Sequence, residues 1–454
     1  MRSLASYKTD LHSKVTTSRR LVEDALQRAT DPAGEGSKVF TKIYEESALA
    51  CAMASDQLRA LGIEAGALSG IPISIKDLFD VAGEPTNGGS VLFADGPNAV
   101  ADSVVVRKLR MAGAVLVGRT NMTEFAFSGL GLNPHYGTPR NPFDRSTGRI
   151  PGGSTSGGAV SVTDGMAAAA IGSDTGGSVR IPAALCGLTG FKPTASRISR
   201  EGVLPLSTTL DAVGVIAPTV RCCALVDSVM ADSPVEVDDG RPLRGVRFGV
   251  LKGYVLDGLD KDVAAKFASA ITTLSSMGAI VEDINVPSLV QIPQCNAKGG
   301  FTAAESYAWH RDLLASSVDR YDPRVSSRIA RGKDISAADH IQLIHARERI
   351  IKEFGCSIRG FDAILMPTVP RIAPTIASLE APHDDAYVDA NLAMLRNPTV
   401  VNFIDGCAMS IPCHKPGDAP VGLTIFGPAH ADGRLLSLGI AVERALANAG
   451  CAIN

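Results

Sequence analysis

The segment between Gly148 and Gly190 contains two serine-bearing turns, Pro151-Gly-Gly-Ser-Thr-Ser-Gly-Gly158 and Gly172-Ser-Asp-Thr-Gly-Gly-Ser-Val-Arg180. Eleven of the 45 glycines of the chain lie in this segment. Glycine at such a density costs backbone entropy, and it is used where the chain needs unusual backbone geometry or a close approach to another group. The sequence therefore predicts a tightly turned segment with a specific structural task.

The second turn has the composition of a site that binds an oxyanion. Ser178 follows Gly176 and Gly177, so backbone N–H groups can approach a ligand there without interference from a Cβ atom. Main-chain donors of this kind stabilise the negative charge that develops during acyl transfer. Two ordinary tight turns remain the alternative interpretation.

A serine nucleophile needs a base, and Lys76 is the candidate because the histidines offer none. No serine lies in a GxSxG motif, and no histidines form an HExxH pair. Lys76 ends the apolar strand Ile71-Pro-Ile-Ser-Ile-Lys76. To act as a base its pKa must be lowered by about 2–3 from the usual value of about 10.4. The alternative is a buried stem with a solvated ammonium head.

Helical and strand patterns alternate along the chain, which predicts an α/β fold with a substantially parallel sheet. Helices are expected at 18–29, 46–61, 104–112, 262–277, 303–317, 337–354 and 434–447, and strands at 71–76, 114–118, 246–251, 279–286, 361–367 and 420–428. Long helical segments dominate the range 291–391, which predicts a helical insertion or cap. Without a repeat or linker, residues 1–454 are expected to form one large domain.

Composition excludes several function classes. The 454 residues include 44 Lys+Arg against 47 Asp+Glu. With a net charge of −3, the chain has no excess of positive charge that would bind nucleic acid. No stretch approaches the roughly 18 apolar residues of a membrane helix, and the N-terminus has no signal peptide pattern. Nine scattered cysteines without a CxxC pair predict buried, reduced thiols rather than zinc or redox sites. We expect a cytoplasmic protein with no metal.

Three segments together carry a resemblance to a known family. Gly70-Ile-Pro-Ile-Ser-Ile-Lys-Asp77 and the two serine turns, the second extended to Ala183, resemble the signature of the amidase-signature hydrolases. Similarity continues through 118–125, 187–194, 206–214 and 420–428. The resemblance implies a large central mixed β-sheet flanked by helices, with the helical cap at about 291–391.

The resemblance also implies the site residues and a mechanism without a cofactor. The family's catalytic triad falls on Ser178 as nucleophile, on Ser154 after a cis peptide bond, and on Lys76 as base. The amides of Thr175, Gly176 and Gly177, with that of Ser178, would form the oxyanion hole. The sequence departs from the family's usual pattern at Thr155, Ser156 and Gly158, but the triad positions are intact.

Two activities remain open, and a non-catalytic scaffold is disfavoured by the intact triad. The first is hydrolysis of small-molecule amides or carbamates (urethanes), with possible action on aryl esters, by a monomer or homodimer. The second is the glutaminase component of a tRNA-dependent amidotransferase complex. That component typically has Gln where Ile181 stands, and Tyr-Gly where this chain has Ser199-Arg-Glu-Gly-Val203.

The walls of the substrate pocket are expected to come from the helical segment and from the loop 204–210. The helical candidates are Tyr307, His310, Tyr321 and Arg324. Arg324 could pair with a substrate carboxylate, although a salt bridge within the protein is the more common role of such a residue.

Overall fold

The computed structural model describes residues 1–231, 233–238, 240–380 and 385–452. In this part of the chain eleven strands form one sheet in the order β1-β3-β2-β4-β6-β5-β10-β11-β9-β7-β8. The strands are β1 Phe40–Ile43, β2 Pro72–Lys76, β3 Val115–Thr120, β4 Ala169–Asp174, β5 Thr189–Lys192, β6 Ala212–Ala217, β7 Arg247–Leu251, β8 Ile280–Ile284, β9 Ala363–Pro367, β10 Cys407–Pro412 and β11 Gly422–Gly427.

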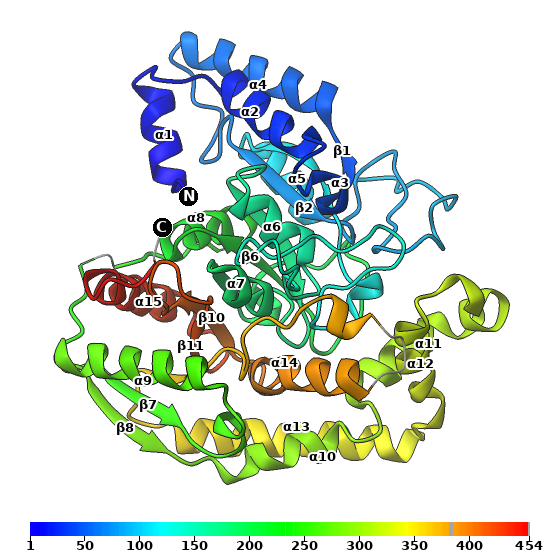
Figure 1. Ribbon diagram of the computed structural model, residues 1–454, viewed down its shortest axis with the longest axis vertical. Helices are drawn as coiled ribbons and strands as arrows, with labels where there is room; N and C mark the ends of the chain where they lie inside the picture. The colour runs from blue at the N-terminus through cyan, green and yellow to red at the C-terminus, as the bar shows by residue number, and fades with distance from the viewer. Residues whose placement is uncertain (232, 239, 381–384, 453–454) are drawn as a thin grey trace.

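Helices cover the sheet and lie at its two ends. They are α1 Leu4–His12, α2 Ser18–Thr30, α3 Gly36–Val39, α4 Glu45–Ala60, α5 Val104–Met111, α6 Ser156–Thr163, α7 Arg180–Cys186, α8 Val220–Met230, α9 Lys261–Ser276, α10 Ile292–Cys295, α11 Gly300–Ser317, α12 Pro323–Ala330, α13 Ala337–Ser357, α14 Asp385–Phe403 and α15 Asp432–Asn448. Helices α1, α2 and α4 lie at one end of the molecule, and α9, β7, β8 and α13 lie at the other (Figure 1).

The sheet is mixed, as the family resemblance implies. Parallel pairs join β2 to β3 and β4, and β7 to β8 and β9. The central pairs from β4 through β6, β5, β10 and β11 to β9 are antiparallel. The expectation of a substantially parallel sheet is therefore wrong for the centre. The short strand β5 is followed by a long loop rather than a crossover helix, so β6 returns beside it in the opposite direction.

The two faces of the sheet bury different helices. In β6, the side chain of Ile216 joins a cluster with residues of α6 and α7, which includes Val162 and Ala183. Its neighbours Val215 and Ala217 belong to the large core cluster that contains residues of α8 and α15. This alternation is the period of two expected of a strand buried on both faces.

The expected helices and strands are present with boundaries shifted by a few residues. Within 291–391 the chain forms α10 to α13 and then β9, which returns to the central sheet. The division into a single domain with a cap stays a prediction. No helix among the described residues combines the length and apolar character that crossing a membrane requires. All nine cysteines are free, and five of them are buried as expected. Cys51 and Cys356 are exposed and Cys295 and Cys451 are only partly buried, so the expectation of buried thiols is wrong for these four.

Strands β2 and β4 place the candidate site. They are parallel neighbours, with Ile75 opposite Ile171, so their carboxyl ends lie at the same edge of the sheet. Lys76 is the last residue of β2, and Asp174 is the last residue of β4. Ligand sites of open α/β sheets form outside the carboxyl ends of strands.

Candidate active site

Lys76 is completely buried at the end of β2. Its Nζ donates hydrogen bonds to Ser154 Oγ at 2.8 Å and to Ser173 Oγ at 2.9 Å. Burial lowers the pKa of Lys76 to about 7, against the opposing charges of Asp174 and Asp211. The alternative of a solvated ammonium head is therefore wrong, because the surrounding fold encloses the whole side chain. A lysine with this pKa can exchange a proton near neutral pH.

Ser154 is fixed by its backbone. The peptide bond between Gly153 and Ser154 is cis, as the resemblance implies. The Ser154 carbonyl accepts a hydrogen bond from Thr123 N at 3.1 Å, and Gly153 N donates to Gly129 O at 2.8 Å. A Cβ atom on Gly153 would lie 2.4 Å from the backbone nitrogen of Gly131. Glycine is thus required at 153 because two backbone segments meet there.

The loop that carries Ser178 is held by the buried carboxylate of Asp174. Asp174 accepts hydrogen bonds from the amides of Gly177 at 2.9 Å and Val179 at 3.1 Å, and from the Arg180 guanidinium at 2.8 and 3.1 Å. Asn402 Nδ2 donates to both the carbonyl and the carboxylate of Asp174. Although burial opposes it, the Arg180 charge holds the pKa of Asp174 well below its usual range.

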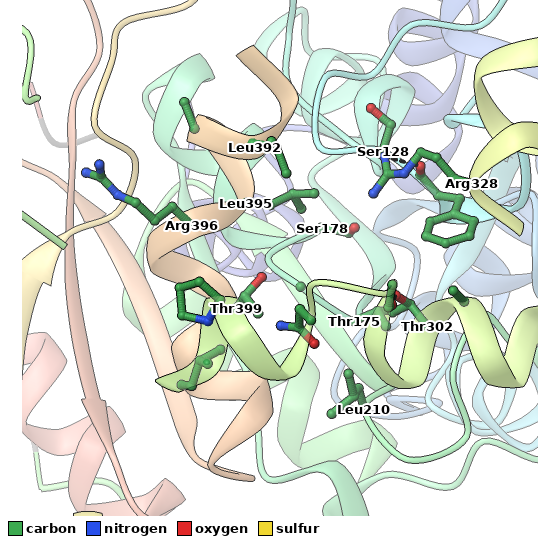
Figure 2. A pocket seen from close by; sticks show the side chains of 18 of the residues that line it. Ser128, Thr175, Ser178, Leu210, Thr302, Arg328, Leu392, Leu395, Arg396 and Thr399 are labelled. Carbon is green, nitrogen blue, oxygen red and sulfur yellow. Dashed lines mark hydrogen bonds between the residues drawn. The ribbon is translucent and has the colours of Figure 1, made fainter. Parts of the chain in front are cut away.

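These contacts determine which amides are available to a ligand. The Gly177 amide is already bonded to Asp174. In the described part of the chain, the amides of Thr175, Gly176 and Ser178 have no hydrogen-bond acceptor. The hydroxyl of Ser178 likewise forms no hydrogen bond with the described residues, and it lies in the cavity shown in Figure 2. These three amides and this hydroxyl can therefore meet a substrate carbonyl.

A second carboxylate supports the same loop from the other side. The Thr175 hydroxyl donates to Asp211, which also accepts the amides of Leu206 at 2.9 Å and Ser207 at 3.1 Å. Burial raises the pKa of Asp211 to about 6. The Ser207 hydroxyl in turn donates to Glu305 of α11 at 2.6 Å. The loop 206–211 thereby links the helix α11 to the candidate oxyanion site.

Ser178 opens into a cavity of about 640 Å³, a volume typical of small-molecule sites. Leu206 and Leu210 line it, as expected of the loop 204–210. The helical residues expected to line it do not. His310 bonds Tyr321 in a buried cluster, and Arg324 pairs with Asp322 at 2.7 Å. Helix α11 instead contributes Thr302 and Ala303, while α12, α14 and nearby loops contribute four arginines, Arg328, Arg331, Arg371 and Arg396.

Sequence reasoning missed several residues of the site. Ser173 and Asn402 each contact a site residue, and Arg328 lines the cavity. Ser173 carries a local signal, since it lies beside Asp174 at the end of a buried strand. Asn402 and Arg328 carry none, because they reach the site from helices far away in the sequence. Among the described residues, no group of His, Cys, Asp and Glu side chains is arranged to hold a metal ion.

Comparison with known proteins supports the family resemblance. The Amidase family model matches residues 20–436. The chain belongs to the amidase family. It is 33% identical over 450 residues to 2-amino-5-chloromuconic acid deaminase of Comamonas testosteroni, covering 97% of this chain and 95% of the relative.

Two further relatives support the same assignment. The glutamyl-tRNA(Gln) amidotransferase component of Chromohalobacter salexigens that this chain matches is 32% identical, covering 96% of this chain and 95% of the relative. A solved structure of an amidase superposes with a TM-score of 0.87 at 31% identity, covering 98% and 99% of the two chains. The protein is therefore an amidase-signature hydrolase.

Proposed function

We propose that this amidase hydrolyses the C–N bond of small-molecule amides or carbamates through an acyl-enzyme on Ser178. The observation that carries the proposal is the contact between buried Lys76 and Ser154, 2.8 Å long, beside the cavity that holds Ser178. The lowered pKa of Lys76 supports its role as the base, and the cis peptide before Ser154 matches the arrangement implied by the family resemblance.

The first half of the reaction forms the acyl-enzyme. Ser178 Oγ bonds to the substrate carbonyl carbon while its proton passes to Ser154 Oγ, and the proton of Ser154 passes to Lys76 Nζ. The π electron pair of the carbonyl moves to its oxygen, where the free amides of Thr175, Gly176 and Ser178 stabilise the charge. The C–N bond then breaks, and the relay returns its proton to the leaving nitrogen.

The second half frees the acid. Water attacks the acyl carbon and gives one proton to the same relay, and the bond from carbon to Ser178 Oγ breaks. The relay then returns this proton to Ser178, so the enzyme regains its starting state and only the acid and the amine are released. Because Lys76 is neutral at the start, each transfer occurs without a net charge entering the buried site.

The relatives support cleavage at a C–N bond. One of them is a deaminase of a carboxylic acid, 2-amino-5-chloromuconic acid. Carbamates share the carbonyl–nitrogen bond of amides, and aryl esters would demand less of the proton relay because their leaving group needs less protonation.

The glutaminase component of an amidotransferase is the second candidate, since one amidotransferase component is 32% identical over nearly the whole chain. Its substrate glutamine carries an ammonium group, which needs a carboxylate partner when bound. Among the described residues that line the cavity, Asp389 is the one with an acidic side chain, and Arg371 already pairs with it. Ile181, where that component typically has Gln, is completely buried. These observations favour the stand-alone hydrolase.

The test is a hydrolysis screen of the isolated protein with aliphatic amides, aryl amides, ureido acids and aryl carbamates. The amine or ammonia released from each compound is measured. We expect turnover of at least one class, and loss of about 10⁴-fold or more in Ser178→Ala. A Ser178→Ala variant with unchanged turnover would refute the acyl-enzyme. Activity on glutamine that appears only after addition of partner proteins would favour the second candidate instead.

A further inference from the structure

Glu305 of α11 is a partly buried carboxylate that accepts hydrogen bonds from the loop 206–211. The donors are the Ser207 hydroxyl at 2.6 Å, the Thr209 amide at 3.1 Å and the Thr209 hydroxyl. Among the described residues, no basic side chain forms an ion pair with Glu305. The carboxylate therefore anchors this loop rather than neutralising a nearby cation.

The loop is a closed unit in which Ser207 is bonded to both ends. The Ser207 carbonyl accepts the amides of Leu210 at 3.1 Å and Asp211 at 2.8 Å. The Asp211 carboxylate in turn accepts the amides of Leu206 and Ser207. Because the hydroxyl of the same serine donates to Glu305, a displacement of Ser207 would carry Asp211 with it.

Asp211 connects this loop to the candidate oxyanion site. Its carboxylate accepts the hydroxyl of Thr175, whose amide is one of the three that are free to meet a substrate carbonyl. The hydroxyl and the amide belong to one residue, so the contact that fixes the side chain also restrains the direction of the N–H group. Oxyanion donors stabilise a transition state only when they are held in place before the reaction.

Helix α11 is a rigid support for this anchor. Phe301, in its first turn, is almost completely buried. Thr302 lines the cavity, and it lies three residues before Glu305, so both residues belong to one side of the helix. In the view of Figure 2, Thr302 lies on the same side of Ser178 as Thr175 does. One helix therefore borders the substrate cavity and holds the loop behind the oxyanion site.

We propose that Glu305 is a positioning residue for C–N bond cleavage, which holds the loop 206–211 so that Asp211 keeps the Thr175 amide directed at the oxyanion of the transition state. This inference rests on the proposed function, since the oxyanion is the one that forms when Ser178 attacks the carbonyl. The charge of Glu305 by itself would act in the opposite direction, because a negative charge near the site disfavours a second one. Positioning and charge thus predict changes of rate with opposite signs.

The first experiment measures kcat and KM of Glu305→Gln with the compound that the hydrolysis screen finds to react fastest. The assay is run at pH 8.5, where Asp211, with a pKa of about 6, is ionised and Lys76, with a pKa of about 7, is neutral. We expect kcat to fall by about 10- to 100-fold with little change in KM, because an oxyanion donor is misplaced while the ground-state contacts remain.

The matched control is Asp312→Asn, which removes an exposed carboxylate from the same helix. This variant should keep the kcat of the wild type. An unchanged or higher kcat in Glu305→Gln overturns the inference, and a higher value is the result expected of the charge alone. An equal loss in Asp312→Asn also overturns it, since the effect would then not depend on the contact with the loop.

A double variant tests the route through Asp211. If Glu305 acts by holding Asp211 in place, its substitution should cost little once Asp211→Asn has already weakened the contact with Thr175. We therefore expect the kcat of the double variant to lie close to that of Asp211→Asn. A kcat reduced by the full product of the two single effects would show that Glu305 acts by another route, and it would overturn the inference.

Hydrogen exchange of backbone amides separates this inference from the proposed function, because it needs no turnover. In Glu305→Gln we expect exchange to be about tenfold faster in both segments 172–180 and 204–212, and unchanged elsewhere, as a sign that the fold is intact. Ser207→Ala, which removes one of the same contacts from the loop, should give the same pattern. Faster exchange confined to 204–212, or no change in either segment, overturns the link to the oxyanion site.

The two proposals can therefore fail separately. If Ser178→Ala abolishes hydrolysis but exchange in 172–180 does not respond to Glu305→Gln, the acyl-enzyme stands and the role of Glu305 is wrong. If exchange in 172–180 does respond while Ser178→Ala retains hydrolysis, the acyl-enzyme is refuted, and the link from Glu305 to Thr175 remains as a feature of the fold.

Discussion

The pH dependence of amide cleavage is the most direct test of the role proposed for Lys76. The relay needs a neutral lysine, so activity should be lost as the pH falls through the pKa of about 7. With this pKa the neutral fraction is about one-tenth at pH 6 and about nine-tenths at pH 8, so kcat/KM should rise roughly tenfold between them. A solvated lysine with a pKa of about 10.4 would be neutral in only about one molecule in 2,500 at pH 7.

The assay is ammonia release from a neutral amide, such as 4-oxopentanamide, between pH 5.5 and 9, so that the substrate does not titrate in the same range. Asp211 is a second group that titrates nearby, since burial raises its pKa to about 6. The variant Asp211→Asn removes this step. It also removes a negative charge that raises the pKa of Lys76, so the limb that remains should lie somewhat below pH 7, although the rate itself decreases. A flat profile between pH 6 and 8, or a rate that still rises about tenfold per pH unit at pH 9, would refute the assignment of Lys76 as a base with a lowered pKa.

Two further substitutions test the surroundings of Lys76. In Ser173→Ala, Lys76 loses a hydrogen-bond acceptor that favours its charged form, so the acid limb of the pH profile should move to lower pH. We also expect kcat to fall by about tenfold. An acid limb that moves to higher pH would contradict this reasoning. In the wild type, the unfolded chain binds more protons at Lys76 than the folded chain between the folded pKa of about 7 and the unfolded value of 10.5, so this lysine makes the free energy of unfolding rise with pH. This rise in the free energy of unfolding amounts to about 2 kcal/mol from pH 7 to pH 9. It should be missing in Lys76→Met when urea unfolding is compared at the two pH values. An identical rise in both proteins would show that Lys76 is charged in the folded state.

The sequence identifies the residues around Lys76 because they follow local rules. Ser154 and Ser178 lie in glycine-rich turns, and Lys76 ends an apolar strand. The structure supplies the reason that these segments meet, which is the parallel pairing of β2 with β4. That pairing also brings Ser173 to the lysine. A pattern of strands predicts such edges in general, but it does not say which two strands are neighbours.

The centre of the sheet could not be predicted by the same rules. Strand β5 has only four residues, and it lies between the mostly apolar helix α7 and the polar segment 193–201, with no alternating pattern of its own. Its antiparallel partners β6 and β10 join it through long-range pairing. Likewise, Tyr307 and His310 are on a helix that does border the cavity, but they lie beyond the residues at its N-terminal end that line it. Which part of a helix faces a cavity depends on tertiary packing, and spacing along the sequence does not reveal it.

Each fully buried cation of the site is stabilised either by an ion pair or by a change of protonation state. Asp174 and Arg180 neutralise each other, and their pair holds the loop in place. Among the described residues, Lys76 has no carboxylate in an ion pair. Lysine can relieve burial by releasing its proton, and the neutral form is the one that the proposed relay needs. Arginine has no such route at physiological pH, so Arg180 stays charged and its burial is compensated by the carboxylate of Asp174. The cost of burying a cation is therefore met by proton release at Lys76 and by ion pairing at Arg180.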